Sequence, residues 1–221
     1  MKKKKILVVA AHPDDEVLGC GGTMAKFANQ GHEVRILLLG SGRADPSSPQ
    51  ERQKILRQSD SANFTLLGFR ERVAMYQFPD NAFDSVKLLD IVHVIEKQKE
   101  LFQPDSIFTH SIHDLNIDHR ITYQAVITAT RPMKGECVRD IFSFEVLSST
   151  EWNYPTRFSP NFFMDISETI NTKLQAIQCY KGELKKFPHP RSLKGIRLNS
   201  EYWGMKVGYE NAEAFELIRA F

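Results

Sequence analysis

The chain has 221 residues, of which 42% are apolar and 25% are charged, and its net charge is +2. These values are typical of a globular protein with one substantial core, and they exclude a largely disordered chain. No stretch approaches the roughly 18 consecutive apolar residues of a membrane-spanning helix. We therefore expect no membrane insertion, and we also expect no nucleic-acid partner.

Two features of the chain bear on its compartment. Residues 2–5 are lysines, and the apolar run that follows them has only about six residues, fewer than the roughly 7–15 of a signal-peptide core. Cys20, Cys137 and Cys179 are odd in number, far apart and without a C-x-x-C spacing, so neither a disulfide framework nor a thiolate zinc site is expected. Both observations favour the reducing cytoplasm.

The first 40 residues predict one β-α-β unit. Residues 6–10 form an apolar run typical of a buried strand, and residues 33–39 form a second one. Between them, the glycine-rich segment 19–22 is expected to open a helix over residues 23–29. This segment lacks the G-x-G-x-x-G spacing of a dinucleotide-binding loop and follows carboxylates that would repel phosphate. We therefore expect its glycines to serve the helix start and close packing, and a nucleotide-dependent dehydrogenase is disfavoured.

The rest of the chain continues the alternation after a polar loop at 40–49. Helices are expected at about 50–67, 84–102, 121–130, 168–180 and 192–209, and strands near 73–78, 106–109, 141–146 and 162–166. Such alternation predicts an α/β fold with a mostly parallel sheet and helices on both faces. The absence of a linker, a repeat or a low-complexity segment favours a single Rossmann-like domain over residues 1–221.

A cluster of polar residues follows the first strand. His12, Asp14, Asp15 and Glu16 stand at its carboxyl end, where ligands bind in α/β sheets. His12 and Asp15 offer a nitrogen and an oxygen donor three residues apart, a combination that suits zinc. Asp14 lies between them and remains available for proton transfer. On its own, this pair is more typical of a turn or cap than of a metal site.

A second polar cluster follows the strand at 106–109. It holds three histidines and two aspartates: His110, His113, Asp114, Asp118 and His119. Because the carboxyl ends of parallel strands meet at one edge of a sheet, a histidine of this cluster can supply the third protein ligand of a catalytic zinc. The two clusters together predict a metal site with one coordination position left for water.

These motifs resemble those of the LmbE/PIG-L family of zinc-dependent N-acetylglucosaminyl deacetylases. The resemblance follows the order of the parts over nearly the whole chain, and it rests on His12-Pro13-Asp14-Asp15-Glu16, Gly21-Gly22 and Asn116-Ile117-Asp118-His119. It implies one zinc ion and hydrolysis of the acetamide of an N-acetylated amino sugar or glycoside. By the family's pattern, His12, Asp15 and His119 would be the zinc ligands and Asp14 the general base.

One position departs from that pattern, because Asn116 stands where many family members have a histidine. The identity of the group that stabilises the oxyanion or acts as general acid therefore stays open among His189, His113 and His110. The resemblance favours His189, since a histidine of the C-terminal region serves near the active site in some relatives, sometimes from a neighbouring subunit. A homo-oligomer is accordingly possible. Asp118 is expected to accept a hydrogen bond from a ligand histidine and fix its tautomer.

Four residues are candidates for contacts with the substrate, each with a plainer alternative. Arg191, close to His189, either grips the substrate or belongs to a surface turn made by the flanking prolines. Arg52 and Arg57 on a predicted helix either contact the substrate or are solvated. Asp80 either binds a sugar hydroxyl or shapes a turn.

Aromatic pairs offer a further choice between sugar stacking and packing in the core or at a subunit contact. They are Trp152 with Tyr154 and Tyr202 with Trp203, and packing is the expected role for both.

Two other functions fit these residues less well than deacetylation does. A non-catalytic metal- or sugar-binding module would have no use for a carboxylate such as Asp14 beside the ligands. A phosphoesterase with two metals would need more ligands than His12, Asp15 and His119 provide. The sequence therefore predicts a zinc-dependent deacetylase of an N-acetylated sugar.

Overall fold

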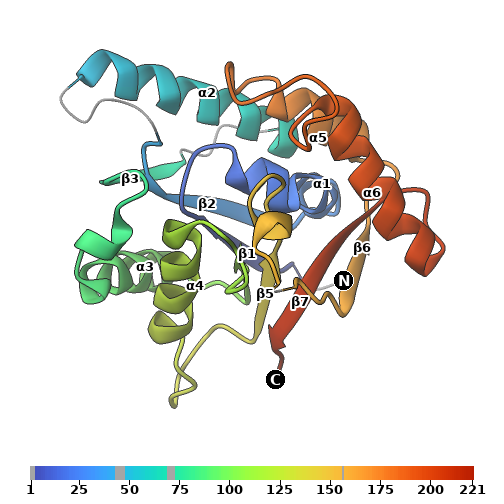
Figure 1. The fold of residues 1–221 in the computed structure, drawn as a ribbon. Helices are drawn as coiled ribbons and strands as arrows, with labels where there is room; N and C mark the ends of the chain where they lie inside the picture. Colours follow the sequence, from blue (N-terminus) through green and yellow to red (C-terminus); the bar gives the residue numbers. More distant parts are fainter. Residues whose placement is uncertain (1–2, 43–47, 69–72, 156) are drawn as a thin grey trace.

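The centre of the molecule is a seven-stranded sheet in the computed structural model, which describes residues 3–42, 48–68, 73–155 and 157–221 (Figure 1). The strands are β1 (Lys5–Ala10), β2 (Glu33–Gly40), β3 (Ala74–Phe78), β4 (Ser106–His110), β5 (Asp140–Phe144), β6 (Phe162–Asp165) and β7 (Ala212–Arg219). They are ordered β3-β2-β1-β4-β5-β7-β6. The first five are parallel, and β7 is antiparallel to both of its neighbours. The predicted α/β class and mostly parallel sheet are confirmed.

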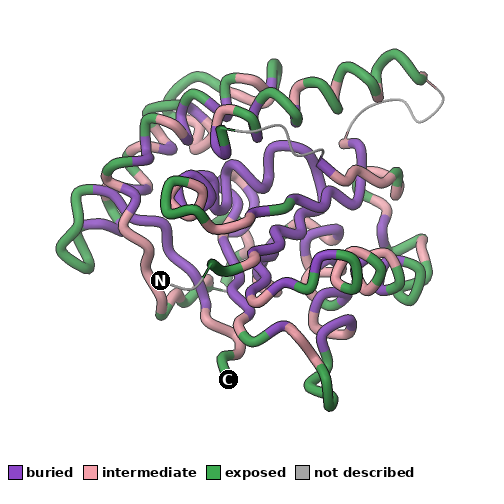
Figure 2. The backbone as a smooth tube through the Cα atoms, turned by 180° about the vertical axis from the view of Figure 1, so that it is seen from behind, coloured by how far each residue is buried: buried purple, intermediate pink, exposed green. Residues whose placement is uncertain are grey.

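Helices cover both faces of this sheet (Figure 1). They are α1 (Asp15–Asn29), α2 (Pro49–Leu67), α3 (Leu88–Phe102), α4 (Ile117–Ala129), α5 (Ile170–Ile177) and α6 (Leu193–Val207). Helices α3 and α4 pack on one face, and the remaining four pack on the other. Figure 2 shows the result, with burial concentrated on the central strands and α1 and exposure on the outer helices and loops.

Strand β1 shows why its sequence is an unbroken apolar run. Ile6 and Val8 belong to the core under α1, α2, α5 and α6, whereas Leu7 and Val9 belong to the core under α3 and α4. A strand whose alternate side chains enter two cores has no solvent-facing position. Polar residues can therefore begin only after Ala10, beyond the carboxyl end of the strand, and this is where the first polar cluster begins.

Helix α1 begins at Asp15, so the expected start at residue 23 was wrong. The glycine-rich segment lies inside the helix, which is kinked at Cys20 (φ −143°, ψ 24°). A Cβ atom on Gly19 would lie 2.2 Å from the Phe144 ring, and one on Gly22 would lie 2.8 Å from Ile166. The glycines thus permit the close packing that was predicted, while the two carboxylates of the first turn suit the positive end of the helix.

A buried ion pair braces the kink in α1. The Glu213 carboxylate on β7 accepts hydrogen bonds from the backbone N–H groups of Gly22 (2.9 Å) and Thr23 (2.7 Å). Lys173 on α5 donates to Glu213 (2.6 Å) and to the carbonyl oxygen of Leu18 (2.7 Å). The backbone groups that the kink releases are therefore paired inside the protein, as buried polar groups require.

Strand β7 was not predicted, whereas the other strands and the helices after α1 lie close to their expected positions. Part of the polar loop expected at 40–49, residues 43–47, lies outside the described residues. Across the described part of the chain, no helix combines the length and apolar character that a membrane crossing requires.

Candidate metal centre and active site

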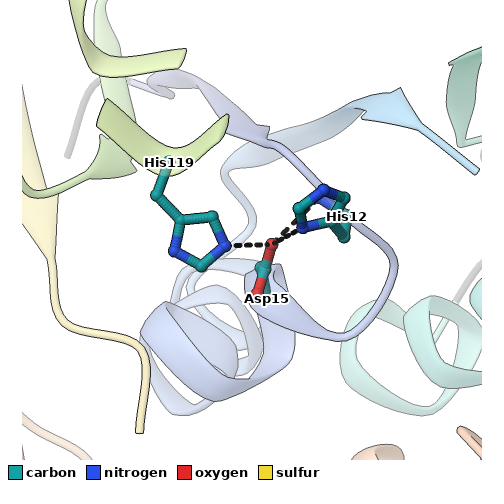
Figure 3. A group of neighbouring side chains, drawn as sticks. All are labelled: His12, Asp15 and His119. Carbon is teal, nitrogen blue, oxygen red and sulfur yellow. Dashed lines mark hydrogen bonds and ion pairs between the residues drawn. The ribbon is translucent and has the colours of Figure 1, made fainter. Parts of the chain in front are cut away.

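Three side chains converge at the carboxyl edge of the sheet. His12 follows β1, Asp15 opens α1, and His119 lies in the first turn of α4, close after β4. The Oδ2 atom of Asp15 lies 3.5 Å from Nδ1 of His12 and 3.2 Å from Nε2 of His119, so the carboxylate stands between the two rings (Figure 3). All three side chains are buried. The predicted convergence of the two polar clusters is therefore present in the structure.

Each ring is held from behind by a second carboxylate. Nε2 of His12 hydrogen-bonds to Oδ2 of Asp118 at 2.8 Å. Nδ1 of His119 lies 3.1 Å from Oδ1 of Asp114. Such carboxylates fix the tautomer and orientation of histidine ligands, and this is the role predicted for Asp118. The remaining nitrogen of each ring points toward Asp15.

The electrostatics of this group suit a cation. Burial lowers the pKa of an imidazole, but Asp118 and Asp15 outweigh burial and raise the pKa of His12 to about 10. Asp15 and Asp114 likewise outweigh burial and raise the pKa of His119 to about 9. Burial would raise the pKa of Asp15, yet His119 and His12 hold it well below its usual value. The carboxylates thus favour positive charge at this point.

The donor set fits a zinc ion. The ligand atoms of His12, Asp15 and His119 all lie within 4.8 Å of one another, and two imidazoles with one carboxylate form a ligand set typical of catalytic zinc. His12, Asp80 and Asp118 form a second such group. In that group, however, Nε2 of His12 is already engaged by Asp118, so we interpret these carboxylates as support for the ring.

Asp14 lies beside His12, Asp15 and His119 but does not belong to the group whose ligand atoms come together. It is buried and adopts a left-handed backbone conformation, with φ 101° and ψ −29°. Its Oδ2 atom accepts a hydrogen bond from Nη1 of Arg191 at 3.0 Å. Burial raises the pKa of Asp14 well above its usual value although Arg191 lowers it. A carboxylate with a raised pKa, next to side chains that could hold a metal ion, is suited to accept and return a proton.

A cleft of about 320 Å³ opens onto this group. Asp14 and the three ligand residues line it together with Asp80 and Asn116, which were singled out from the sequence. The segments 148–152 and 183–191 supply further lining residues, among them Trp152, Glu183, Lys185, His189 and Arg191. The C-terminal polar stretch therefore belongs to the cleft and is not a remote surface turn.

Two of these lining residues, Glu183 and Lys185, could not be recognised from the sequence. Glu183 lies 3.7 Å from Nη1 of Arg191, and Lys185 donates from its Nζ atom to the carbonyl oxygen of Gly182. A charged residue in a polar stretch carries no signal that separates it from a solvated one. Trp152 is 41% exposed and lines the cleft, so it does not pack in a core, and its expected role at a subunit contact stays a prediction.

The histidines proposed as alternatives to His189 are placed differently. Nε2 of His110 accepts a hydrogen bond from the backbone N–H of Ala11, and its ring stacks on His119 with a centroid distance of 3.9 Å. His110 is fully buried behind the ligand and does not face the cleft. His113 is likewise absent from the described residues that line the cleft. His189 is present there, with Nδ1 accepting from the backbone N–H of Arg191 at 3.1 Å.

Asn116 is used to start helix α4. Its Oδ1 atom accepts from the backbone N–H of Asp118 at 2.8 Å, which caps the helix next to His119. Its Nδ2 atom donates to Asn81 across the cleft lining at 3.0 Å. The residue that replaces the family's histidine thus has a structural role, and it still faces the cleft.

The two arginines of α2 do not join this cleft. Nη1 of Arg52 donates to Oε1 of Gln77 at 2.6 Å. Arg57 lines a separate hollow with Gln178 and Lys181. Helix α2 itself packs against α1 and α5, and neither arginine is among the described residues that line the cleft. Their role as substrate contacts stays a prediction that the cleft lining does not support.

The chain belongs to the PIG-L family. The family model described as GlcNAc-PI de-N-acetylase matches residues 7–130, which is more than half of the chain. The resemblance noted in the sequence is thereby confirmed, and the matched part contains His12, Asp15 and His119.

Individual relatives extend the match beyond that part. The chain is 25% identical to the diacetylchitobiose deacetylase of Thermococcus kodakarensis, over 97% of this chain and 83% of that protein. It is 26% identical to the 4-oxalmesaconate hydratase of Pseudomonas putida, over 82% of this chain and 74% of that one. Among solved structures, the conserved protein TT1542 from Thermus thermophilus matches with a TM-score of 0.76 and 26% identity, covering 96% of this chain and 94% of that one.

Proposed function

We propose that this protein is a zinc-dependent deacetylase that hydrolyses the acetamide of an N-acetylated amino sugar or glycoside. The observation that carries the proposal is the position of Asp14, a buried carboxylate beside a zinc-type ligand set at a cleft. A pure binding site has no use for such a group, whereas amide hydrolysis requires one.

His12, Asp15 and His119 would hold the ion. When bound, zinc lowers the pKa of a coordinated water to about 7 and polarises a carbonyl oxygen, which makes an acetamide a better electrophile. The rings of His12 and His119 need little rearrangement for this purpose, because Asp118 and Asp114 already hold their outer nitrogens.

Asp14 would carry the proton through the reaction. Water loses a proton to the Asp14 carboxylate as its oxygen adds to the acetyl carbon. The C–N bond then breaks, and Asp14 returns the proton to the departing nitrogen, so that acetic acid and a free amine are formed, and the acid then releases its proton to solvent as acetate. The hydrogen bond from Arg191 keeps the carboxylate oriented without making it a ligand.

The cleft offers groups for the rest of the substrate. His189 and Arg191 can donate to the developing oxyanion or to sugar hydroxyls, as preorganised polar groups do in hydrolases. Asp80 can accept from a hydroxyl, and the exposed Trp152 ring can stack on the apolar face of a sugar. An N-acetylated mono- or disaccharide suits a cleft of this polarity.

Hydration of an unsaturated acid is the second candidate, favoured by the similarity to the 4-oxalmesaconate hydratase. Both reactions use a water that must be deprotonated. They differ in the product, because hydration adds water across a carbon–carbon double bond and releases no amine.

A substrate screen separates the two candidates. The metal-depleted protein is incubated with N-acetylated mono- and disaccharides and glycosides, with zinc or with chelator, and amine release is measured. Unsaturated dicarboxylic acids form the parallel arm, followed by loss of their absorbance. We expect zinc-dependent amine release that is lost in the variant Asp14→Asn. Hydration without amine release from any N-acetyl compound would replace the deacetylase proposal.

A further inference from the structure

We propose that Glu16 and Tyr180 are positioning residues that hold the general base Asp14 in its working orientation. This inference rests on the proposed function and deepens it, since it assigns the last residue of the first polar cluster and a tyrosine 164 positions away to the same proton-transfer step. Neither residue lines the cleft, so both act through Asp14.

The backbone of Asp14 requires such support. Its φ angle of 101° lies in the left-handed region, where a residue with a Cβ atom is strained. A residue keeps such a conformation only where its surroundings fix it, and such residues cluster at active sites. The conformation places Asp14 at the turn from β1 into α1, with its carboxylate toward Arg191 and its peptide N–H away from the cleft.

Glu16 supplies the fixing contact. Its Oε2 atom accepts the hydrogen bond of the Asp14 backbone N–H at 3.0 Å, two residues back along the chain. The carboxylate is completely buried. A bond to the N–H group restricts rotation about the Asp14 backbone, and therefore determines where the Asp14 side chain points.

The other oxygen of Glu16 is anchored to two further elements. Oε1 accepts a short hydrogen bond from the hydroxyl of Tyr180, just beyond α5, and one of 3.2 Å from Nδ2 of Asn63 on α2. Tyr180 is 2% exposed. Glu16 therefore joins the peptide of Asp14 to α2 and to the segment after α5.

The chemistry of the site calls for a carboxylate. The three donors that reach Glu16 are a peptide N–H, a phenol and an amide, and they approach both oxygens. A glutamine has only one acceptor oxygen and cannot accept on both sides. Burying a carboxylate among neutral donors costs free energy. Packing alone does not account for this cost, whereas the need to hold Asp14 does.

Asp14 is thus held at two points. Glu16 fixes its backbone on the interior side, and Arg191 contacts its carboxylate on the cleft side. Tyr180 fixes Glu16 in turn. Loss of the Tyr180 hydroxyl should loosen the base while the zinc ligands, which are held by other groups, stay in place.

The test uses the zinc-loaded protein with the best substrate of the amine-release screen. Tyr180→Phe removes one oxygen and keeps the ring, and misplacing a catalytic group by about 1 Å can cost on the order of 100-fold. We expect kcat to fall by about 10- to 100-fold, with KM and zinc stoichiometry unchanged. Glu16→Gln, which keeps the size of the side chain, should act in the same direction. Tyr76→Phe is the matched control, because it removes a hydroxyl that contacts Gln98 away from the cleft.

A double-mutant cycle with Asp14→Asn distinguishes positioning from general stability. If Tyr180 acts through the base, Tyr180→Phe should not lower the residual rate of Asp14→Asn any further. A purely structural role would instead lower the rate in both backgrounds, together with the thermal midpoint and the zinc content, and would overturn the inference. So would a wild-type kcat for both Tyr180→Phe and Glu16→Gln. Absence of amine release by the wild-type protein would count against the proposed function itself.

Discussion

Nη1 of Arg191 lies 3.0 Å from Oδ2 of Asp14, although the two residues are 177 positions apart in the chain. Nε of the same guanidinium donates to the carbonyl oxygen of Leu147 at 3.0 Å. Arg191 is therefore fixed at one end by backbone and presents the other end to Asp14, the proposed base. This contact brings the C-terminal third of the chain into the chemistry of the N-terminal motif.

Arg191→Lys should lower kcat by about 10- to 100-fold while zinc binding is kept, because an ammonium group cannot make both contacts at the geometry of a guanidinium. The measurement is steady-state amine release at saturating substrate. Arg197→Lys serves as the control, since Arg197 on α6 contacts Asn171 rather than the cleft. Equal rates for the two variants would show that the Asp14 contact has no part in turnover.

His12→Ala or His119→Ala should abolish tight zinc binding, because each removes one of three ligands. Asp118→Ala should weaken zinc affinity by roughly 10- to 100-fold, as is typical when a carboxylate behind a ligand histidine is removed. Affinities are measured by competition with a chromogenic chelator. His93→Ala, on the exposed face of α3, should bind zinc like the wild type. Unchanged affinity in His119→Ala would remove His119 from the site.

Asp14→Asn should keep its zinc and lose turnover by a factor on the order of 10²–10⁴, because an amide has the size of the carboxylate but cannot accept the proton. Zinc content and amine release are measured on the same preparation. Loss of the metal would identify Asp14 as a ligand, and near wild-type turnover would place the base elsewhere.

Trp152→Ala should raise KM by about 2- to 10-fold with little change in kcat, which corresponds to the roughly 0.5–1.5 kcal/mol of an aromatic contact. The reason is that Trp152 lines the cleft and offers a ring face for stacking, whereas it has no group that takes part in the proposed proton transfer. Tyr154→Ala is the matched control, because Tyr154 is 83% exposed and outside the cleft lining among the described residues. Equal KM values for the two variants would exclude a stacking role.

Glu145→Gln should stabilise the fold at neutral and alkaline pH. Burial raises the pKa of Glu145, although Asn199 and Trp203 donate to Oε1 and lower it. The folded state therefore binds this proton more tightly than the unfolded state, so the stability contribution is present at acid pH and is lost as the pH rises through the folded pKa. Glutamine keeps the acceptor oxygen without the charge.

The thermal midpoints of the wild type and of Glu145→Gln, measured at about pH 5 and pH 8, check this expectation. The lower pH is chosen because it lies close to the ordinary pKa of a glutamate, about 4.3. The gain of Glu145→Gln over the wild type should be larger at pH 8 than at pH 5. A gain that is larger at pH 5 would contradict the assigned direction of the pKa shift.

Much of the fold could be predicted because its signals are local. The apolar run before His12 belongs to a strand buried on both faces, and the spacing of His12 and Asp15 is set within one turn. The meeting of the two polar clusters followed from a general property of parallel sheets. The expected cytoplasmic location and self-association are not tested by the fold and stay predictions.

Strand β7 could not be predicted because its buried charges hid it. Glu213 and Glu216 interrupt the apolar pattern that marks a strand, yet both are buried in the sheet. Their partners lie far away in sequence, with Lys173 paired to Glu213 and Ser111 donating to Glu216. Arg191 also has a partner far away in sequence, because it donates to Asp14. The sequence alone does not distinguish it from Arg52 and Arg57 on α2.

The kink at Cys20 divides helix α1 into two parts, and the Lys173–Glu213 ion pair contacts the backbone on both sides of it. The first turn, which carries Asp15 and Glu16, is tied to α2 and the end of α5. The part beyond the kink is held by Lys173 and Glu213 and packs closely through Gly22. Because Lys173 also holds the carbonyl oxygen of Leu18 in the first half of the helix, a variant that stabilises the molecule around β7 should be checked for turnover as well as for its thermal midpoint.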